Sequence, residues 1–156
     1  MPLPPSPITS ALIAYAHYLC IVLCFGALLY ERMSLQVDLN RKQVISMIVA
    51  DVIYGVAGLV LLVSGIIRVK YFGQGVDFYT HNPIFWFKIA LYIVVGLLSL
   101  YPTVTYILWA IPLSRNNLPS ITSDLVSRFR IIINIELIGF SVIPLFATLM
   151  SRGIGL

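Results

Sequence analysis

The amino-acid sequence predicts an all-α integral membrane protein, an up-down-up-down four-helix bundle in which residues 1–156 form a single membrane domain. Three observations predict this fold. Hydrophobic residues make up 60% of the chain and charged residues only 10%, whereas a soluble domain carries about 25% charged residues. Four runs are each long enough for the roughly 20 apolar residues that a membrane span needs. Polar segments separate these runs, so the chain crosses the bilayer four times in alternating directions.

The first span is expected at about residues 10–29, after a proline-rich start that lacks the positive region of a secretory signal. Thr9 or Ser10 is expected to cap its helix, because hydroxyl side chains satisfy free amide groups at a helix start. Cys20 and Cys24 lie one turn apart on this helix. Two cysteines so placed on one intact helix cannot form a disulfide with each other.

The second span is expected at about residues 45–67, after a polar loop over residues 33–44. The stretch that follows, residues 65–88, reads GIIRVKYFGQGVDFYTHNPIFWFK and is dense in aromatic and charged residues. Aromatic rings concentrate at headgroup depth, because one end of the ring is apolar and the other is polar. We therefore interpret the part between the spans as a loop at the membrane surface.

The third span is expected at about residues 84–109, with Pro83 in its first turn and Pro102 kinking its interior. A second polar loop is expected over residues 112–130, and Ser123 or Asp124 would cap the last helix. The fourth span follows at about residues 129–150, with Pro144 as a second internal kink. These four spans use most of the chain and leave no room for a soluble domain.

Basic residues are unequally divided between the two sides of the predicted membrane. The loops after the first and third spans carry six of them: Arg32, Arg41, Lys42, Arg115, Arg128 and Arg130. The other side carries Arg68, Lys70 and Arg152, with Lys88 near that surface. Because cytoplasmic loops are enriched in Lys and Arg, both termini are expected outside the cytoplasm of a bacterial inner or thylakoid-type membrane.

Small and polar residues at helical spacing predict which faces of the helices meet inside the bundle. On the second span these residues are Asp51, Tyr54, Gly55, Gly58, Leu62, Gly65 and Arg68. On the third they are Lys88, Tyr92, Gly96, Ser99, Thr103 and Tyr106, and on the first His17, Cys20, Cys24 and Glu31. The glycines either allow close helix packing or clear space for a flat ligand, and the two roles are compatible.

His17 is the only histidine within a span and is the candidate metal ligand, because neutral imidazole binds haem iron and other transition metals. The alternative is a buried histidine that is hydrogen-bonded to a neighbouring helix. Together with Cys20 and Cys24 it could also bind a soft ion such as Cu(I). Lys88 and Arg68 either hold an anionic group, such as a porphyrin propionate or a lipid phosphate, or extend to the headgroups.

Three acidic residues lie in or next to the spans, towards the side with more basic residues: Glu31, Asp51 and Glu136. Charges inside membrane spans are rare and usually functional. The three carboxyl groups could form a proton path. They could equally form structural ion pairs with Arg32, Arg128 and Arg130. Standard hydrolase and nucleotide-binding motifs are absent, and no basic patch with exposed aromatic residues indicates nucleic-acid binding.

The segments DVIYGVAGLVLLVSGIIRV, GVDFYTHNPIFWFKIALY and LLSLYPT resemble an uncharacterised family of bacterial four-span membrane proteins, known only as a domain of unknown function. A looser resemblance is to HemJ-type protoporphyrinogen oxidases, which are four-span haem-binding bundles. Their functionally important first-span histidine and early third-span lysine match His17 and Lys88. Their later third-span histidine has no counterpart in GLLSLYPT, and their arginine after the first-span histidine matches at best Arg32.

The resemblance leads to a first hypothesis, a membrane protein that binds haem b or a porphyrin for a redox role. His17 would be an axial ligand, Lys88 and Arg68 would hold propionates, and Tyr54 and Tyr92 would line the pocket. The second hypothesis is a non-enzymatic accessory or assembly subunit of a larger membrane complex, or a homo-oligomer in the lipid bilayer. A small transporter is a third hypothesis. Whether the protein is an enzyme remains open at this stage.

Overall fold

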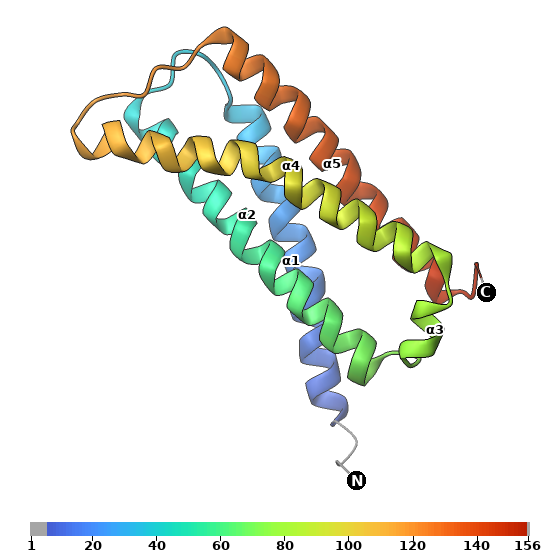
Figure 1. Cartoon of the computed structure of the whole chain (residues 1–156). Helices are drawn as coiled ribbons and strands as arrows, with labels where there is room; N and C mark the ends of the chain where they lie inside the picture. The colour runs from blue at the N-terminus through green and yellow to red at the C-terminus, as the bar shows by residue number, and fades with distance from the viewer. Residues whose placement is uncertain (1–5, 156) are drawn as a thin grey trace.

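Four long helices run the length of the molecule in the computed structural model, which describes residues 6–155 (Figure 1). They are α1 (Pro7–Ser34), α2 (Arg41–Ile67), α4 (Pro83–Ser114) and α5 (Ser123–Ser151). A π-helical segment, Arg68–Phe72, continues α2, and the short helix α3 (Val76–Thr80) leads into α4. The described part of the chain contains no strand, so the predicted all-α four-helix bundle is confirmed.

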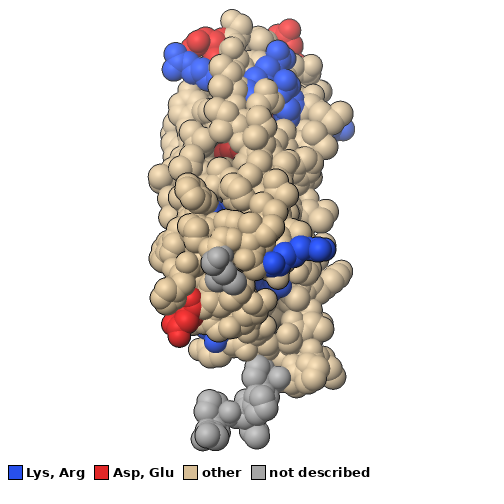
Figure 2. Space-filling view, turned by 90° about the vertical axis from the view of Figure 1, so that its right-hand side faces the viewer, with Lys and Arg blue, Asp and Glu red and all other residues tan. Residues whose placement is uncertain are grey.

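All four long helices are long and apolar enough to cross a membrane. The 28 residues of α1 extend for about 42 Å, which exceeds the roughly 30 Å hydrocarbon core of a bilayer. On the face in Figure 2, charged side chains gather towards the two ends and an almost uncharged band lies between them. This distribution is the one expected when lipid surrounds the middle of the bundle.

The helices begin earlier and end later than the predicted spans, so both predicted polar loops are too long. The observed connections cover only residues 35–40 and 115–122. Asn40 caps the start of α2 and forms a reciprocal capping box with Gln43. The first turn of α2 therefore consists of polar residues that were predicted to lie in a loop. Thr122, rather than Ser123 or Asp124, caps α5, and Ser6, rather than Thr9 or Ser10, caps α1.

Residues 68–82, which were predicted to form a surface loop, contain regular helical structure. The π-helical segment and α3 occupy much of this stretch, and Gly75 between them has a φ of 97°, which favours glycine. The indole Nε1 of Trp86 donates a hydrogen bond to the Thr80 carbonyl at 2.9 Å. Pro83 lies in the first turn of α4, as predicted. Helices α4 and α5 continue through Pro102 and Pro144.

The four helices form two hairpins, α1 with α2 and α4 with α5. Helix α1 also contacts α5, and α2 contacts α4, whereas the pairs α1–α4 and α2–α5 lie across the diagonals of the bundle. The hairpins draw apart towards the end that carries α3 (Figure 1). The starts of α1 and α4 and the ends of α2 and α5 lie at this end, which we call the terminal end. The opposite end, with the two connections, is called the loop end.

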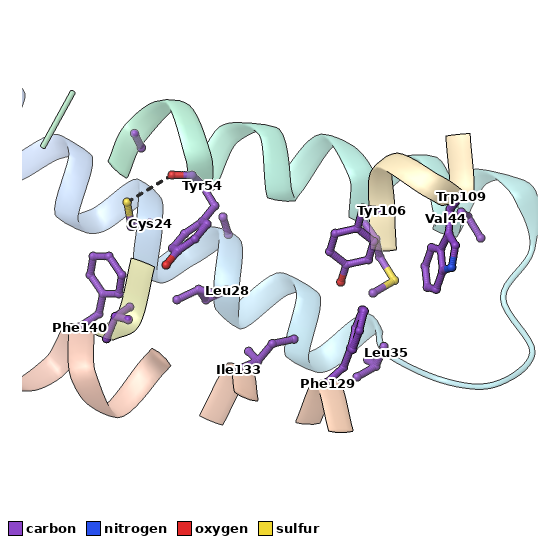
Figure 3. Packing of buried hydrophobic residues seen from close by; sticks show 14 of the residues in the cluster. Cys24, Leu28, Leu35, Val44, Tyr54, Tyr106, Trp109, Phe129, Ile133 and Phe140 are labelled. Carbon is purple, nitrogen blue, oxygen red and sulfur yellow. Dashed lines mark hydrogen bonds between the residues drawn. The ribbon is translucent and has the colours of Figure 1, made fainter. Parts of the chain in front are cut away.

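Large side chains fill the centre of the bundle (Figure 3). Tyr106, Trp109 and Phe129 form an aromatic cluster, with ring centroids 5.2 Å, 5.5 Å and 6.2 Å apart. Nearer the middle, the ring of Tyr54 on α2 packs edge-on against Phe140 on α5, with centroids 5.8 Å apart. The first cluster joins the neighbouring helices α4 and α5, whereas the Tyr54–Phe140 contact reaches across the α2–α5 diagonal, where the backbones do not meet.

The predicted inward face of α2 is partly wrong. A Cβ atom added at Gly55 would meet nothing within 4 Å, and Leu62 is 41% exposed. The buried stripe consists of Val44, Met47, Ala50, Asp51, Tyr54, Ala57, Leu61 and Ser64. Alanine and serine therefore line the contact between α1 and α2, and of the proposed glycines Gly65 also permits it, because an added Cβ there would lie 3.3 Å from Cε1 of His17. Gly96 on α4 likewise has no close neighbour.

Candidate functional site

His17 on α1 contacts the second helix of its own hairpin. Its Nδ1 lies 2.9 Å from the hydroxyl of Ser64 on α2. That hydroxyl also lies 2.7 Å from the Val60 carbonyl of its own helix. When Ser64 donates its proton to this carbonyl, it accepts from Nδ1–H of His17, and the lone pair of the neutral ring is on Nε2. A histidine fixed through one nitrogen, with the other available, has the arrangement of a metal ligand.

Two cationic side chains lie near His17 at the terminal end, close enough for their charges to act on the ring. Arg68 donates to the Tyr18 hydroxyl at 3.1 Å and lies 4.9 Å over that ring. Lys88 on α4 is half-buried, and its Nζ lies 5.2 Å from the centroid of Phe85. The fold thus brings three of the predicted site residues together from α1, α4 and the end of α2.

The two tyrosines predicted to line a pocket lie further from His17. The Tyr92 hydroxyl donates to the carbonyl of Gly58 at 2.7 Å, one and a half turns along α2 from Ser64. Tyr54 is ten residues from Ser64, or about 15 Å along α2. Its ring belongs to the central core. Tyr92 therefore lies between the histidine and the core, and Tyr54 lies in a different layer.

Both cysteines are free and buried beside α2, as the exclusion of a disulfide requires. The thiol of Cys24 donates a long hydrogen bond of 3.7 Å to the Tyr54 carbonyl (Figure 3). Within residues 6–155, no three side chains of the His, Cys, Asp or Glu types group closely enough to hold a metal ion. The geometry therefore gives no support to a copper site built from His17, Cys20 and Cys24.

The three acidic residues lie deep in the bundle on three different helices. Glu31 on α1 and Glu136 on α5 are each 1% exposed, and Asp51 on α2 is 7% exposed. Side chains of α4 reach two of them: Tyr106 donates to Glu31 Oε2 at 3.0 Å, and Thr103 donates to Asp51 Oδ1 at 2.8 Å.

Two of the three arginines proposed as partners of these carboxyl groups bind elsewhere, and the third, the exposed Arg130, forms no ion pair within residues 6–155. Arg32 Nε donates to Asn134 Oδ1 at 2.8 Å, which ties α1 to α5. Arg128 pairs with the exposed Asp124 one turn away, at 3.0 Å, and this is the one ion pair among the described residues. Hydroxyl donors from α4 therefore hold Glu31 and Asp51 but do not reach Glu136.

Sequence reasoning placed Thr103 and Tyr106 on the inward face of α4 and missed Ser64. Ser64 falls seven residues after Ala57 and fourteen after Ala50, so these three small residues mark one side of α2. This heptad spacing is the pattern that could have identified it, because seven residues make almost two helical turns.

A model of one family, described as "Predicted membrane protein (DUF2214)", matches residues 9–155 of the chain. No curated protein and no solved structure matches it.

Proposed function

The chain belongs to the DUF2214 family of predicted membrane proteins, and we propose that it binds a haem or porphyrin at its terminal end for a redox role. One observation carries this proposal. His17 is oriented through Nδ1 by Ser64 and keeps Nε2 for a ligand bond, close to two cations. His17, Lys88 and Arg68 suit an anionic macrocycle such as haem, because imidazole binds the haem iron and basic side chains bind the haem carboxylates.

Each residue has a distinct role in this proposal. His17 would supply an axial ligand, and Ser64 would hold its ring in one tautomer. Lys88 and Arg68 would bind the propionates, and Lys88 makes no ion pair within residues 6–155 that would compete. An open apolar hollow of about 320 Å³ lies on the outer surface between α1 and α2, lined by Ala16 and Ser64 among others but not by His17 itself. A bound haem would supply one-electron transfer.

The test is an absorption spectrum of the detergent-purified protein produced with added haem, in oxidised and reduced form. His81→Ala is the matched control for His17→Ala, because His81 is the only other histidine and its Nδ1 bonds only to the Asp77 carbonyl of its own turn. We expect a Soret band in the wild type and in His81→Ala that is lost in His17→Ala. A colourless wild-type protein would overturn the proposal.

We also propose that the loop end faces the cytoplasm of a bacterial inner or thylakoid-type membrane. The six basic residues counted on that side belong to the end of α1, the starts of α2 and α5, and the residue that follows α4. The positive-inside rule then places both termini outside the cytoplasm.

A second candidate function is an accessory or assembly subunit of a larger membrane complex, or a homo-oligomer. The observation in its favour is that α4 is the least covered of the four long helices, with Trp86 54% and Phe87 67% exposed at its start. Cross-linking of an Ile107→Cys variant in membranes tests the homo-oligomer, since Ile107 is on the exposed face of α4. A disulfide-linked dimer would favour it, and a monomer under all oxidants would exclude self-association through this face.

A further inference from the structure

The buried carboxyl groups of Glu31, Asp51 and Glu136 lack the partners that buried charges require. Tyr106 satisfies one oxygen of Glu31, and Thr103 satisfies one oxygen of Asp51. Oε1 of Glu31 and Oε1 of Glu136 are fully buried and make no hydrogen bond to any residue between 6 and 155. An ionised oxygen in this position loses its hydration and gains nothing in return.

No basic side chain of the described chain compensates these groups. Arg32 and Arg128 are engaged with Asn134 and Asp124, and neither forms an ion pair with the buried acids. The side chains that donate to the acids are the phenol of Tyr106 and the hydroxyl of Thr103 on α4, which carry no positive charge. Three uncompensated negative charges at one level of a membrane bundle would be very costly.

A metal ion does not suit the arrangement as well as protons do. No three carboxyl groups within residues 6–155 approach closely enough to ligate one ion. Protons need no common centre, because each binds to a single carboxyl oxygen and removes one charge. We propose that Glu31, Asp51 and Glu136 form an intramembrane proton-binding site, with protons held on the glutamate oxygens that have no hydrogen-bond donor.

The aromatic cluster covers the loop-end side of this site. Tyr106 both donates to Glu31 and packs against Trp109 and Phe129, which continue towards the loop end (Figure 3). On the other side, Tyr54 and Phe140 separate the acids from the layer that contains His17. The proton site is therefore distinct from the proposed haem site, and failure of one proposal leaves the other standing.

The composition of the chain allows a direct test, because Glu31 and Glu136 are its only glutamates. Uniform incorporation of carboxyl-¹³C glutamate labels these two groups, and infrared spectroscopy separates the carbonyl band of a carboxylic acid from the bands of a carboxylate. We expect a labelled acid band at neutral pH that is lost in alkaline buffer. This measurement uses the unmodified chain, so it does not depend on whether a variant folds.

Variants then assign the band to its residues. Glu31→Gln and Glu136→Gln should each reduce the labelled acid band, and the exposed Asp38→Asn is the matched control that should leave it unchanged. Labelled bands of carboxylate alone at neutral pH would overturn the proposal. An acid band that is present in choline chloride and lost in sodium chloride at the same pH would also overturn it, because sodium would then be the bound cation.

Discussion

The hydroxyl of Tyr106 on α4 donates a hydrogen bond to Oε2 of Glu31 on α1, at 3.0 Å, across a diagonal of the bundle. The backbones of α1 and α4 do not approach each other, so two long side chains make the connection. Both residues are 1% exposed. The bond therefore links the two hairpins through the centre of the molecule.

Replacing Tyr106 with Phe should lower the free energy of unfolding by about 1 kcal/mol, which is typical of a hydrogen bond between membrane helices. The ring, and hence the packing against Trp109 and Phe129, is kept. Tyr15→Phe is the matched control, because Tyr15 is 66% exposed and should change stability by less than about 0.5 kcal/mol. Reversible unfolding in mixed detergent micelles measures both, and equal effects of the two variants would contradict the prediction.

Gly139 on α5 lies directly against α4. A Cβ atom added there would lie 2.5 Å from Cγ2 of the buried Val95, whose branched side chain has little freedom to move. We expect Gly139→Ala to destabilise the bundle by about 1–3 kcal/mol through overpacking. Gly26→Ala is the control, because nothing lies within 4 Å of its added Cβ, and it should be neutral or stabilising by up to about 1 kcal/mol. Thermal unfolding in detergent distinguishes the two.

The sequence predicts the fold well because membrane spans depend on composition and length, which are local properties. Helix ends depend on individual caps. Asn40, with Gln43 three residues later, and Thr122 extend the helices into segments whose polarity suggested loops. The inward face of α2 was harder to predict, because two small residues can be neighbours in sequence and differ in burial. Ala57 is buried, whereas Gly58 is only partly buried.

The site was predictable in part for a similar reason. A histidine, a lysine and three acids are conspicuous in apolar spans, so His17, Lys88, Glu31, Asp51 and Glu136 could all be identified as candidates. Their partners could not, because partners depend on how helices are rotated and paired. The bonds from Ser64 to His17 and from Tyr106 to Glu31 each join residues at least 47 positions apart.

Asn82 ties the start of α4 to the C-terminal residues. It is 0% exposed, its Oδ1 accepts from the Ile84 amide at 2.9 Å, and its Nδ2 donates to the Ile154 carbonyl at 3.0 Å. Asn82→Ala should remove both bonds and cost about 1–2 kcal/mol. Asn82→Asp keeps the cap but replaces the donor with a buried oxygen that faces the Ile154 carbonyl, so it should destabilise at least as much as Asn82→Ala and should also expose the C-terminus. Carboxypeptidase digestion beside thermal unfolding separates these effects, and a C-terminus equally resistant in all three proteins would show that the Ile154 bond does not hold it.

Ser64 provides a test of how His17 is held. If the ring is a haem ligand, loss of its hydroxyl partner should weaken haem affinity by about 10–100-fold without abolishing binding. Ser141→Ala is the matched control, because its exposed hydroxyl bonds only to the Leu137 carbonyl of its own helix. Haem titration of the purified apoprotein gives the affinities. Unchanged affinity in Ser64→Ala would show that the hydrogen bond does not support the ligand.

The proposed orientation predicts which ends of the molecule react with a membrane-impermeant maleimide. The native Cys20 and Cys24 are buried, so the folded wild-type protein should not react and serves as the control. Tyr71→Cys places a thiol at a 68% exposed position of the terminal end, and Asp38→Cys places one in the exposed connection at the loop end. With intact bacterial cells whose outer membrane has been permeabilised, Tyr71→Cys should be labelled and Asp38→Cys should not. Inverted membrane vesicles should give the opposite result. Labelling of Asp38→Cys alone in the cells would reverse the orientation, because the six basic residues at the loop end would then lie outside.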